Sequence, residues 1–213
     1  MRVASNWKDF EVIDTSSGEK LERWGDVILA RPDPQIIWNT QKGADWKKAN
    51  ARYQRSSSGG GQWDNKSMDK DQWHINYGPL TFKISPTNFK HTGLFPEQAV
   101  NWDWFSDKIK KAKVENPNRE IKVLNLFAYT GAASLAARCA GADTTHLDSV
   151  RQVVTWAKGN MESSGLDNIR WVVEDALKFV KREAKRGNKY NGLIMDPPAY
   201  GHGPDGEKWK LDE

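Results

Sequence analysis

The stretch from Lys122 to Gly131 places the strongest constraint on how this chain can fold. Its first half predicts a short buried strand that ends at the polar residue Asn125. A turn containing Gly131 follows, and a helix of small residues starts at once at Ala132. A helix N-terminus presents free backbone N–H groups, and a glycine lets a ligand approach the backbone closely. The stretch therefore predicts a crevice for a ligand.

From residue 120 onward, predicted strands and helices alternate. The strands are expected at 121–126, 143–148, 169–174 and 191–196, and the helices at 131–140, 150–163 and 175–186. Because each connection between strands carries a helix, this α/β pattern indicates a Rossmann-like parallel sheet with right-handed crossovers. Ligands of such sheets bind beyond the carboxyl ends of the strands.

Each predicted strand delivers a polar residue at its carboxyl end: Asn125, Asp148, Asp175 and Asp196. Asp148 follows Asn125 by 23 residues, where a carboxylate accepts hydrogen bonds from the ribose hydroxyls of a nucleoside. Asp175 is placed to accept from an adenine amino group. One such acid is more often a helix N-cap or a solvated turn, but four of them in one repeating unit favour a ligand site. Only one glycine of the Gly-x-Gly-x-x-Gly pattern is present, and no lysine-containing phosphate loop exists, which argues against a dinucleotide.

The first half of the chain is predicted to be a β-rich region over 1–95, ahead of a second domain over 96–213. Strands are expected at 10–14 and 27–30, a hairpin at 72–77 and 80–84, and a loop at the Gly/Ser tract 56–61. Trp46, Tyr53 and Trp63 lie among basic residues, so they either pack into a small core, which we favour, or stack on bases. A helix is predicted from Glu97 to Lys113. Its inward residues are expected to be Val100, Trp104, Phe105 and Ile109.

Composition narrows the class of protein. The chain has 213 residues, a net charge of +4 and a pI near 9.0, which permits a polyanionic partner such as RNA. Its single cysteine, Cys139, excludes an intrachain disulfide, argues against a cysteine-based metal site and is expected to be buried. No run of 18 apolar residues and no signal-peptide core are found, so we expect a cytoplasmic protein without a membrane span.

The chain resembles the class I S-adenosylmethionine-dependent methyltransferases, and within them the 23S rRNA cytosine-C5 methyltransferases and their uncharacterised relatives. The resemblance covers roughly residues 72 to 213. It rests on these segments: Lys90–Gly93, Pro96–Gln98, Leu124–Gly131, Leu147–Ser149, Trp156–Asn160, Glu174–Ala176 and Asp196-Pro-Pro-Ala-Tyr200.

The resemblance implies S-adenosyl-L-methionine as cofactor, no metal, and RNA, with rRNA favoured, as the methyl acceptor. It implies that the loop from Phe127 to Gly131 wraps the methionine portion, that Asp148 takes the ribose, and that Asp175 takes the adenine. Asp196 and Tyr200 are implied to act on the methyl group and the target base. The complete implied cofactor set is Gln98, Asn125, Phe127, Ala128, Tyr129, Thr130, Gly131, Asp148, Ser149, Asp175, Ala176 and Asp196.

Two departures from the family pattern leave alternatives open. Family members add further strands and a cysteine nucleophile for C5 chemistry, whereas Cys139 lies in a different element, so either the chain is truncated or the chemistry differs. Asp196-Pro-Pro-Ala-Tyr200 is also one residue longer than the Asp-Pro-Pro-Tyr pattern of enzymes that methylate exocyclic amines. A methyltransferase acting on a small molecule or a protein, and a non-catalytic cofactor-binding fragment, remain as alternatives.

The expected order of the four strands, 3-2-1-4, leaves the strand from Leu193 to Asp196 at an edge. An exposed apolar edge invites pairing with another chain. We therefore expect a homo-oligomer, reduced solubility, or a cover supplied by the N-terminal β region.

Overall fold

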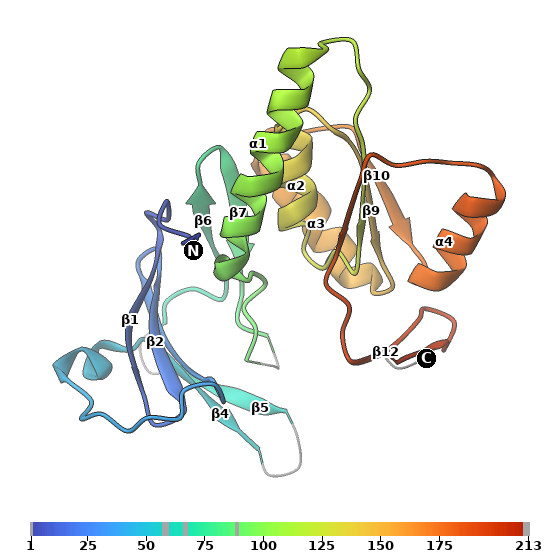
Figure 1. Ribbon diagram of the computed structural model, residues 1–213. Coiled ribbons are helices and arrows are strands. Elements are labelled where there is room, and N and C mark those ends of the chain that lie inside the picture. The colour runs from blue at the N-terminus through green and yellow to red at the C-terminus, as the bar shows by residue number, and fades with distance from the viewer. Residues whose placement is uncertain (1, 57–59, 66–67, 88–89, 211–213) are drawn as a thin grey trace. The chain divides into compact units, whose positions relative to one another are not determined.

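A computed structural model describes residues 2–56, 60–65, 68–87 and 90–210 of the chain. The chain divides into two units, one spanning Ala4–Pro96 and the other spanning Glu97 onward together with the first residues of the chain. Each unit is described by itself below (Figure 1).

The second unit is built on a parallel sheet of four strands: β8 (Lys122–Leu126), β9 (Asp143–Asp148), β10 (Ile169–Val173) and β11 (Gly192–Met195). Their order is β10-β9-β8-β11, and all neighbouring pairs are parallel. The predicted parallel sheet and its strand order are confirmed. The order places β11 at an edge of the described sheet.

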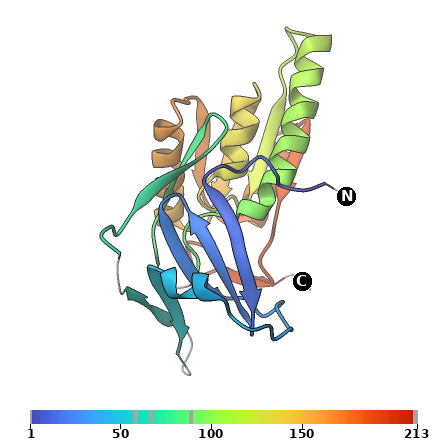
Figure 2. The same ribbon diagram turned by 90° about the vertical axis from the view of Figure 1, so that its left-hand side faces the viewer.

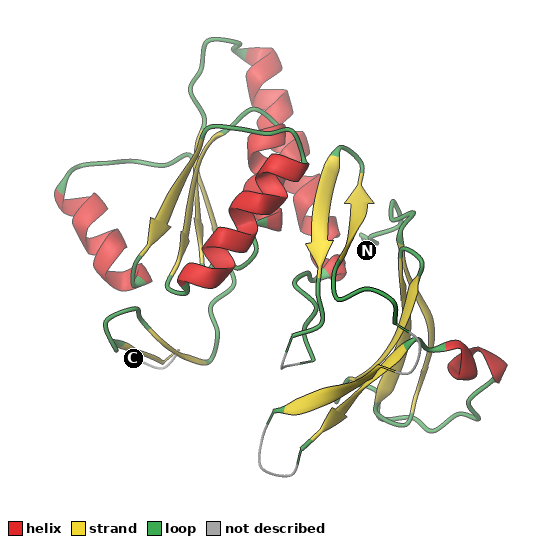
Figure 3. Ribbon diagram, turned by 180° about the vertical axis from the view of Figure 1, so that it is seen from behind, coloured by secondary structure: helices red, strands yellow, loops and turns green. Residues whose placement is uncertain are grey.

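Helices cover both faces of this sheet: α1 (Ala99–Glu115), α2 (Ala132–Cys139), α3 (Arg151–Ser163) and α4 (Ala176–Lys185), with a short 3-10 turn (Pro96–Gln98) before α1 (Figure 3). Because side chains of a strand alternate between faces, Val123 packs with Ile109 of α1 and Ala137 of α2, whereas the next residue, Leu124, packs on the opposite side with Phe179 of α4. The carboxyl ends of the strands therefore lie between helices on two sides.

Two predictions about side chains in this unit are wrong. The buried residues of α1 are Ala99, Trp102 and Ile109, and Trp104 is exposed at 46%. Cys139, expected to be buried, is exposed at the last position of α2. Of the other residues expected to face inward on α1, Ile109 is buried and Phe105 packs against the same core, so the error on this helix concerns Trp104.

A short antiparallel hairpin, β12 (Tyr200–His202) and β13 (Lys208–Lys210), follows β11 and had not been predicted. Figure 1 shows β12 beyond the carboxyl ends of β9 and β10, below α4. The hairpin therefore lies at the end of the sheet where a ligand is expected.

The first unit contains a sheet in the order β1-β2-β3-β4-β5, whose strands Figure 2 turns toward the viewer. Its elements are β1 (Phe10–Ser16), β2 (Glu19–Trp24), β3 (Val27–Pro32), a 3-10 turn η1 (Ala44–Lys48), β4 (Ala51–Arg55) and β5 (Gly61–Asn65), with a separate hairpin of β6 (Trp73–Tyr77) and β7 (Leu80–Ile84). The predicted hairpin and the two predicted strands are confirmed, whereas β2, β4 and β5 were missed. Half of the loop predicted at 56–61, residues 57–59, lies outside the described residues, and Gly61 is already the first residue of β5.

Two of the three aromatic residues that could have stacked on bases belong to the interior of this unit, and Trp63 is half-buried. Trp46 and Tyr53 are buried, and the ring of Tyr53 lies 5.4 Å from that of Trp63 in an edge-on contact. The indole N–H of Trp46 donates to Asp14 at 2.6 Å. The core interpretation therefore holds for Trp46 and Tyr53.

Candidate cofactor and acceptor site

The loop after β8 has an unusual backbone conformation. Phe127, Tyr129 and Gly131 have φ values of 54°, 50° and 90°, so alternate residues adopt the left-handed region. A non-glycine residue in that region is strained and persists only where its surroundings hold it. At Gly131 a side chain is also excluded, because an added Cβ would lie 2.8 Å from the Cβ of Ala157 in α3.

Hydrogen bonds from neighbouring elements hold this loop. The N–H of Ala128 donates to the carbonyl of Leu147 at 3.0 Å, and the N–H of Tyr129 donates to the carboxylate of Asp148 at 2.9 Å. On the other side, the buried amide of Asn160 in α3 donates to the carbonyl of Thr130 at 2.9 Å. The end of β9 and the body of α3 therefore fix the loop from two directions.

Asp148 sits at the end of β9, where a ligand carboxylate was predicted. Its second oxygen accepts from the N–H of Val150 at 2.9 Å. Burial raises the pKa of Asp148 above its ordinary value, against the opposing effect of hydrogen bonds from the backbone N–H groups of Val150, Tyr129 and Ser149. A carboxylate has about four acceptor positions, so three backbone donors leave capacity for a hydroxyl of a ligand.

Asn125 differs from its predicted position. β8 continues to Leu126, so Asn125 is an interior strand residue, 3% exposed, and not the polar end of the strand. Its amide donates to the hydroxyl of Ser134 at 2.9 Å, and this hydroxyl lies 3.0 Å from Nδ1 of His146. Asn125 thus belongs to a buried polar network that links β8, α2 and β9 beneath the loop.

His146 is fully buried in that network. Burial lowers its pKa to about 3, so the imidazole is neutral near pH 7. Its ring also lies 4.7 Å from that of Trp171 on β10. The network buries no charge, and it pairs Nδ1 of His146, whereas Nε2 of the same ring is buried without a hydrogen-bond partner.

Asp175 caps α4. Its carboxylate accepts from the N–H of Lys178 at 2.9 Å, so the helix-cap interpretation considered for strand-end acids applies here. It is 8% exposed, and Ala176 next to it is 6% exposed. The role of this pair toward an adenine stays a prediction.

The segment from Asp196 to Tyr200 follows β11 and is largely exposed, Tyr200 to 55%. The carbonyl of Pro198 accepts a hydrogen bond of 2.7 Å from the indole N–H of Trp209. The indole ring of Trp209 in turn lies 4.8 Å from the ring of Phe127. Trp209 therefore connects the predicted acceptor segment with the predicted cofactor loop.

Gln98 stands at the start of α1, where its amide oxygen accepts from Asn101 at 2.8 Å. Its role toward a cofactor stays a prediction. Within the described ranges, no group of three or more His, Cys, Asp or Glu is arranged to hold a metal ion. None of the helices in the described part of the chain is long and apolar enough to cross a bilayer.

Three side chains of this region were missed in the sequence. Ser134 and His146 look like ordinary polar positions, because only the pairing of Asn125 with His146 across β8 and β9 brings them together. Trp209 carried a usable signal: Gly203-Pro-Asp-Gly206 is a strong turn sequence, and Lys208-Trp-Lys210 alternates as a strand does.

Comparison with known proteins gives one family match and several longer relatives. The family described as "Conserved hypothetical protein 95" matches residues 104–204. Ribosomal RNA large subunit methyltransferase K/L of Shewanella frigidimarina is 35% identical over 122 residues, which cover 56% of this chain and 16% of the relative. The protein of the same name from Shewanella amazonensis is 30% identical over 189 residues, covering 84% of this chain and 23% of the relative. The chain therefore spans less than a quarter of these curated relatives.

Among solved structures, the SAM-dependent methyltransferase from Agrobacterium tumefaciens is 40% identical with a TM-score of 0.90, and the match covers 98% of this chain and 66% of that one. SMU.776, solved in complex with SAH, matches with a TM-score of 0.69 at 18% identity, over 98% of this chain and 56% of that one. The second likeness concerns the fold alone.

Proposed function

The chain is related to the class I S-adenosylmethionine-dependent methyltransferases, among them the large-subunit rRNA methyltransferases, and from this we propose that it binds S-adenosylmethionine and transfers the methyl group to a base of rRNA. The observation that carries the proposal is the clamped loop from Phe127 to Gly131 with Asp148 bonded to it. A strained loop with a half-buried carboxylate beside it suits a nucleoside whose ribose hydroxyls donate to that carboxylate. Such hydroxyl donors would stabilise an anion whose pKa burial has raised.

The proposed cofactor lies along the carboxyl ends of the strands. Its methionine portion would rest on Phe127 to Gly131, its ribose on Asp148 and Ser149, and its adenine beside Asp175 and Ala176. Asp196 and Tyr200 would face the methyl group and the acceptor base. Because the sulfonium carbon is already reactive, these residues would act mainly by aligning the acceptor with it.

An acceptor base within a duplex would have to be turned out of its stack before it reached Asp196. The net charge of +4 suits the approach of a polyanion. We extend the proposal to a role in rRNA maturation and a cytoplasmic location, since the names of the relatives refer to rRNA of the large ribosomal subunit. A methyl acceptor that is a small molecule or a protein is the competing outcome of the experiment below.

Calorimetric titration with S-adenosylmethionine tests the cofactor site. Asp148→Ala should weaken binding about 10- to 100-fold, because the ribose loses hydrogen bonds to a charged acceptor. Asp143→Ala is the matched control, since Asp143 is exposed at the opposite end of the same strand and should leave the dissociation constant unchanged. Equal affinities for the two variants would remove Asp148 from the site.

Transfer of a labelled methyl group then tests the acceptor. Label should enter an unmodified transcript of large-subunit rRNA and should not enter bulk protein or small metabolites. If the protein binds the cofactor but transfers no methyl group to RNA, the proposal that RNA is the acceptor is refuted and only the cofactor-binding function stands.

A further inference from the structure

The hairpin of β12 and β13 is a well-formed element at the open end of the sheet. Gly201 pairs with Trp209 in its ladder. Its turn is closed by a hydrogen bond of 2.7 Å from the N–H of Gly203 to the carbonyl of Glu207 and one of 3.1 Å from Gly206 to Gly203. The position of Trp209 is therefore set by backbone pairing and not by its side-chain contacts alone.

The indole of Trp209 makes two contacts with the candidate site. Its N–H donates to the carbonyl of Pro198 at 2.7 Å, and its ring lies 4.8 Å from Phe127 at an interplanar angle of 55°. A planar aromatic ring with an N–H donor is also the chemistry of a nucleic-acid base. Trp209 thus contacts the carbonyl of Pro198 and the ring of Phe127, which are the groups that a base would contact next to the segment from Asp196 to Tyr200.

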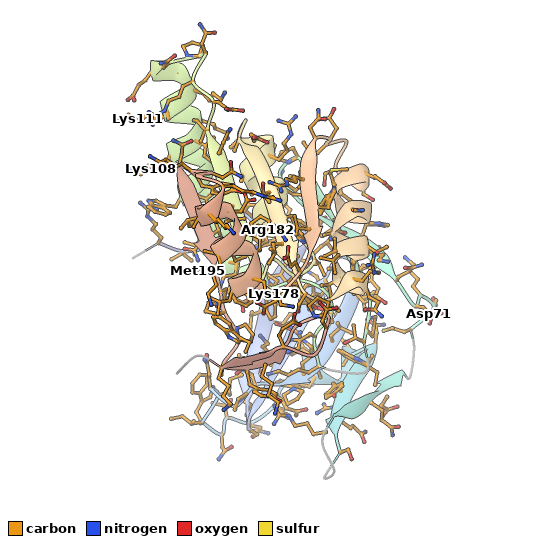
Figure 4. The ribbon with its side chains drawn as sticks, turned by 90° about the vertical axis from the view of Figure 1, so that its right-hand side faces the viewer. Asp71, Lys108, Lys111, Lys178, Arg182 and Met195 are labelled. Carbon is orange, nitrogen blue, oxygen red and sulfur yellow. The ribbon has the colours of Figure 1, made fainter. Side chains whose placement is uncertain are left out.

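Ion pairs with α4 also hold the hairpin. Lys178, which is labelled in Figure 4, lies in the first turn of α4. Its ammonium pairs with Glu207 and lies 3.5 Å from the carboxylate of Asp205. Exposed pairs of this kind are weak and are screened by salt. Opening of the hairpin would break, among other contacts, the ring contact with Phe127, the hydrogen bond to Pro198 and the salt-sensitive pairs of Lys178.

We infer that Trp209 occupies the place of the methyl acceptor and that the β12–β13 hairpin is a gate, which an aromatic base must displace to reach Pro198 and Phe127. The inference rests on the proposed function, because it assigns the acceptor side of the same site. The acceptor must compete with the indole, so its apparent affinity is reduced by the fraction of molecules in which the hairpin is open.

Steady-state kinetics with an unmodified large-subunit rRNA transcript, alongside calorimetry with S-adenosylmethionine, test this inference. Trp209→Ala should lower the KM for the transcript about tenfold, since the ring contact and the hydrogen bond no longer oppose entry. The change in KM should exceed any change in the affinity for the cofactor. Trp209→Phe keeps a ring without the N–H and should fall between the wild type and the alanine variant.

Two further variants sharpen the test. Trp38→Ala is the matched control, because Trp38, like Trp209, donates its indole N–H to a backbone carbonyl, that of Thr15 at 3.0 Å. It should leave the KM unchanged. Lys178→Met should lower the KM at low salt and match the wild type at high salt, where the pair with Glu207 is already screened.

The outcomes separate this inference from the proposed function. Methyl transfer by the wild type with an unchanged or higher KM in Trp209→Ala overturns the gate and leaves the methyltransferase intact. A variant that tightens cofactor binding alone also overturns it, because Trp209 would then cover the cofactor and not the acceptor. No transfer by either protein refutes the function, and the gate with it.

Discussion

Replacement of Gly131 by alanine should destabilise the domain more than any other glycine replacement next to α2. Gly131 has a φ of 90°, and an added Cβ would lie 2.8 Å from the Cβ of Ala157 and 3.3 Å from Cδ1 of Leu135. The left-handed backbone costs an alanine about 1–2 kcal/mol. The overlap with α3 adds about 1–3 kcal/mol, because Ala157 is part of a rigid helix and has no flexible side chain to move away.

The matched control is Gly141→Ala, just beyond the other end of α2. Gly141 has a φ of 99°, so the backbone strain is the same, but an added Cβ would approach only the flexible side chain of Lys113, at 3.9 Å. The reduced entropy of the unfolded chain returns about 0.4–1 kcal/mol in both variants. Gly131→Ala should therefore cost about 2–4 kcal/mol, and Gly141→Ala about 1 kcal/mol or less.

Urea unfolding followed by circular dichroism measures both costs, and hydrogen exchange of the α2 amides locates them. The affinity for S-adenosylmethionine should fall in Gly131→Ala and stay unchanged in Gly141→Ala, because only the first variant displaces the loop. Equal destabilisation by the two replacements would show that the close approach of α2 to α3 has no energetic consequence and would refute the reasoning.

Three further predictions follow from individual side chains. The pKa of His146 is lowered to about 3, so between about pH 6.5 and pH 3 the unfolded chain binds a proton that the folded chain does not. The free energy of unfolding should therefore fall by about 2 kcal/mol from pH 7 to pH 5. In denaturation curves measured across this range, His146→Gln should remove this contribution to the pH dependence of the free energy of unfolding. Trp102→Ala should cost about 3–5 kcal/mol and Trp104→Ala less than about 0.5 kcal/mol, since only Trp102 is buried, and equal losses would contradict the observed rotation of α1. Leu193 and Met195 on β11 are 63% and 60% exposed, so the protein should self-associate with rising concentration, and Leu193→Lys should restore a monomer in sedimentation; a monomer before the replacement would refute association through β11.

The sequence predicted the strands of the second unit well because each is a short apolar run followed by a helix. On α1 it predicted Phe105 and Ile109 correctly and Trp104 wrongly. Trp102 and Trp104 have identical side chains, so the residue type alone does not indicate which of the two is buried. The stripe through Ala99, Trp102 and Ile109 is the one that continues into apolar positions, whereas the face of Trp104 continues into Asp107 and Lys108.

Charged residues are the reason why strand β2 of the first unit was not predicted from the sequence. β2 has the sequence Glu-Lys-Leu-Glu-Arg-Trp, which does not look like a buried strand. Glu22 is nonetheless fully buried, because Arg31 on β3 donates to it twice, at 2.7 and 3.0 Å. A buried charge is tolerated when it is paired: Lys20 on the same strand lies 3.1 Å from Glu22, and the pairing of β2 with β3 adds the two hydrogen bonds from Arg31. The register between two strands cannot be predicted from the sequence of either strand alone.

The candidate site could be predicted to the extent that it is local in the sequence. The turn at Gly131 and the acid at Asp148 could be identified from their own segments. The support beneath them could not, because Asn125, Ser134 and His146 come from three elements and meet only after the sheet has formed. The same holds for Trp209, whose contact with Phe127 joins residues far apart in the chain.

The two sides of the site differ in how firmly they are held, and this difference has a functional consequence. Phe127 and Tyr129 keep strained backbones, at a cost of about 1–3 kcal/mol each, because Asp148, Asn160 and the buried network fix the loop before any ligand arrives. A preformed loop binds without a further loss of conformational entropy. The hairpin that carries Trp209 is held in part by ion pairs of Lys178, which salt screens. The cradle therefore needs no rearrangement to receive a cofactor, whereas an acceptor that has to open the hairpin binds with a reduced apparent affinity.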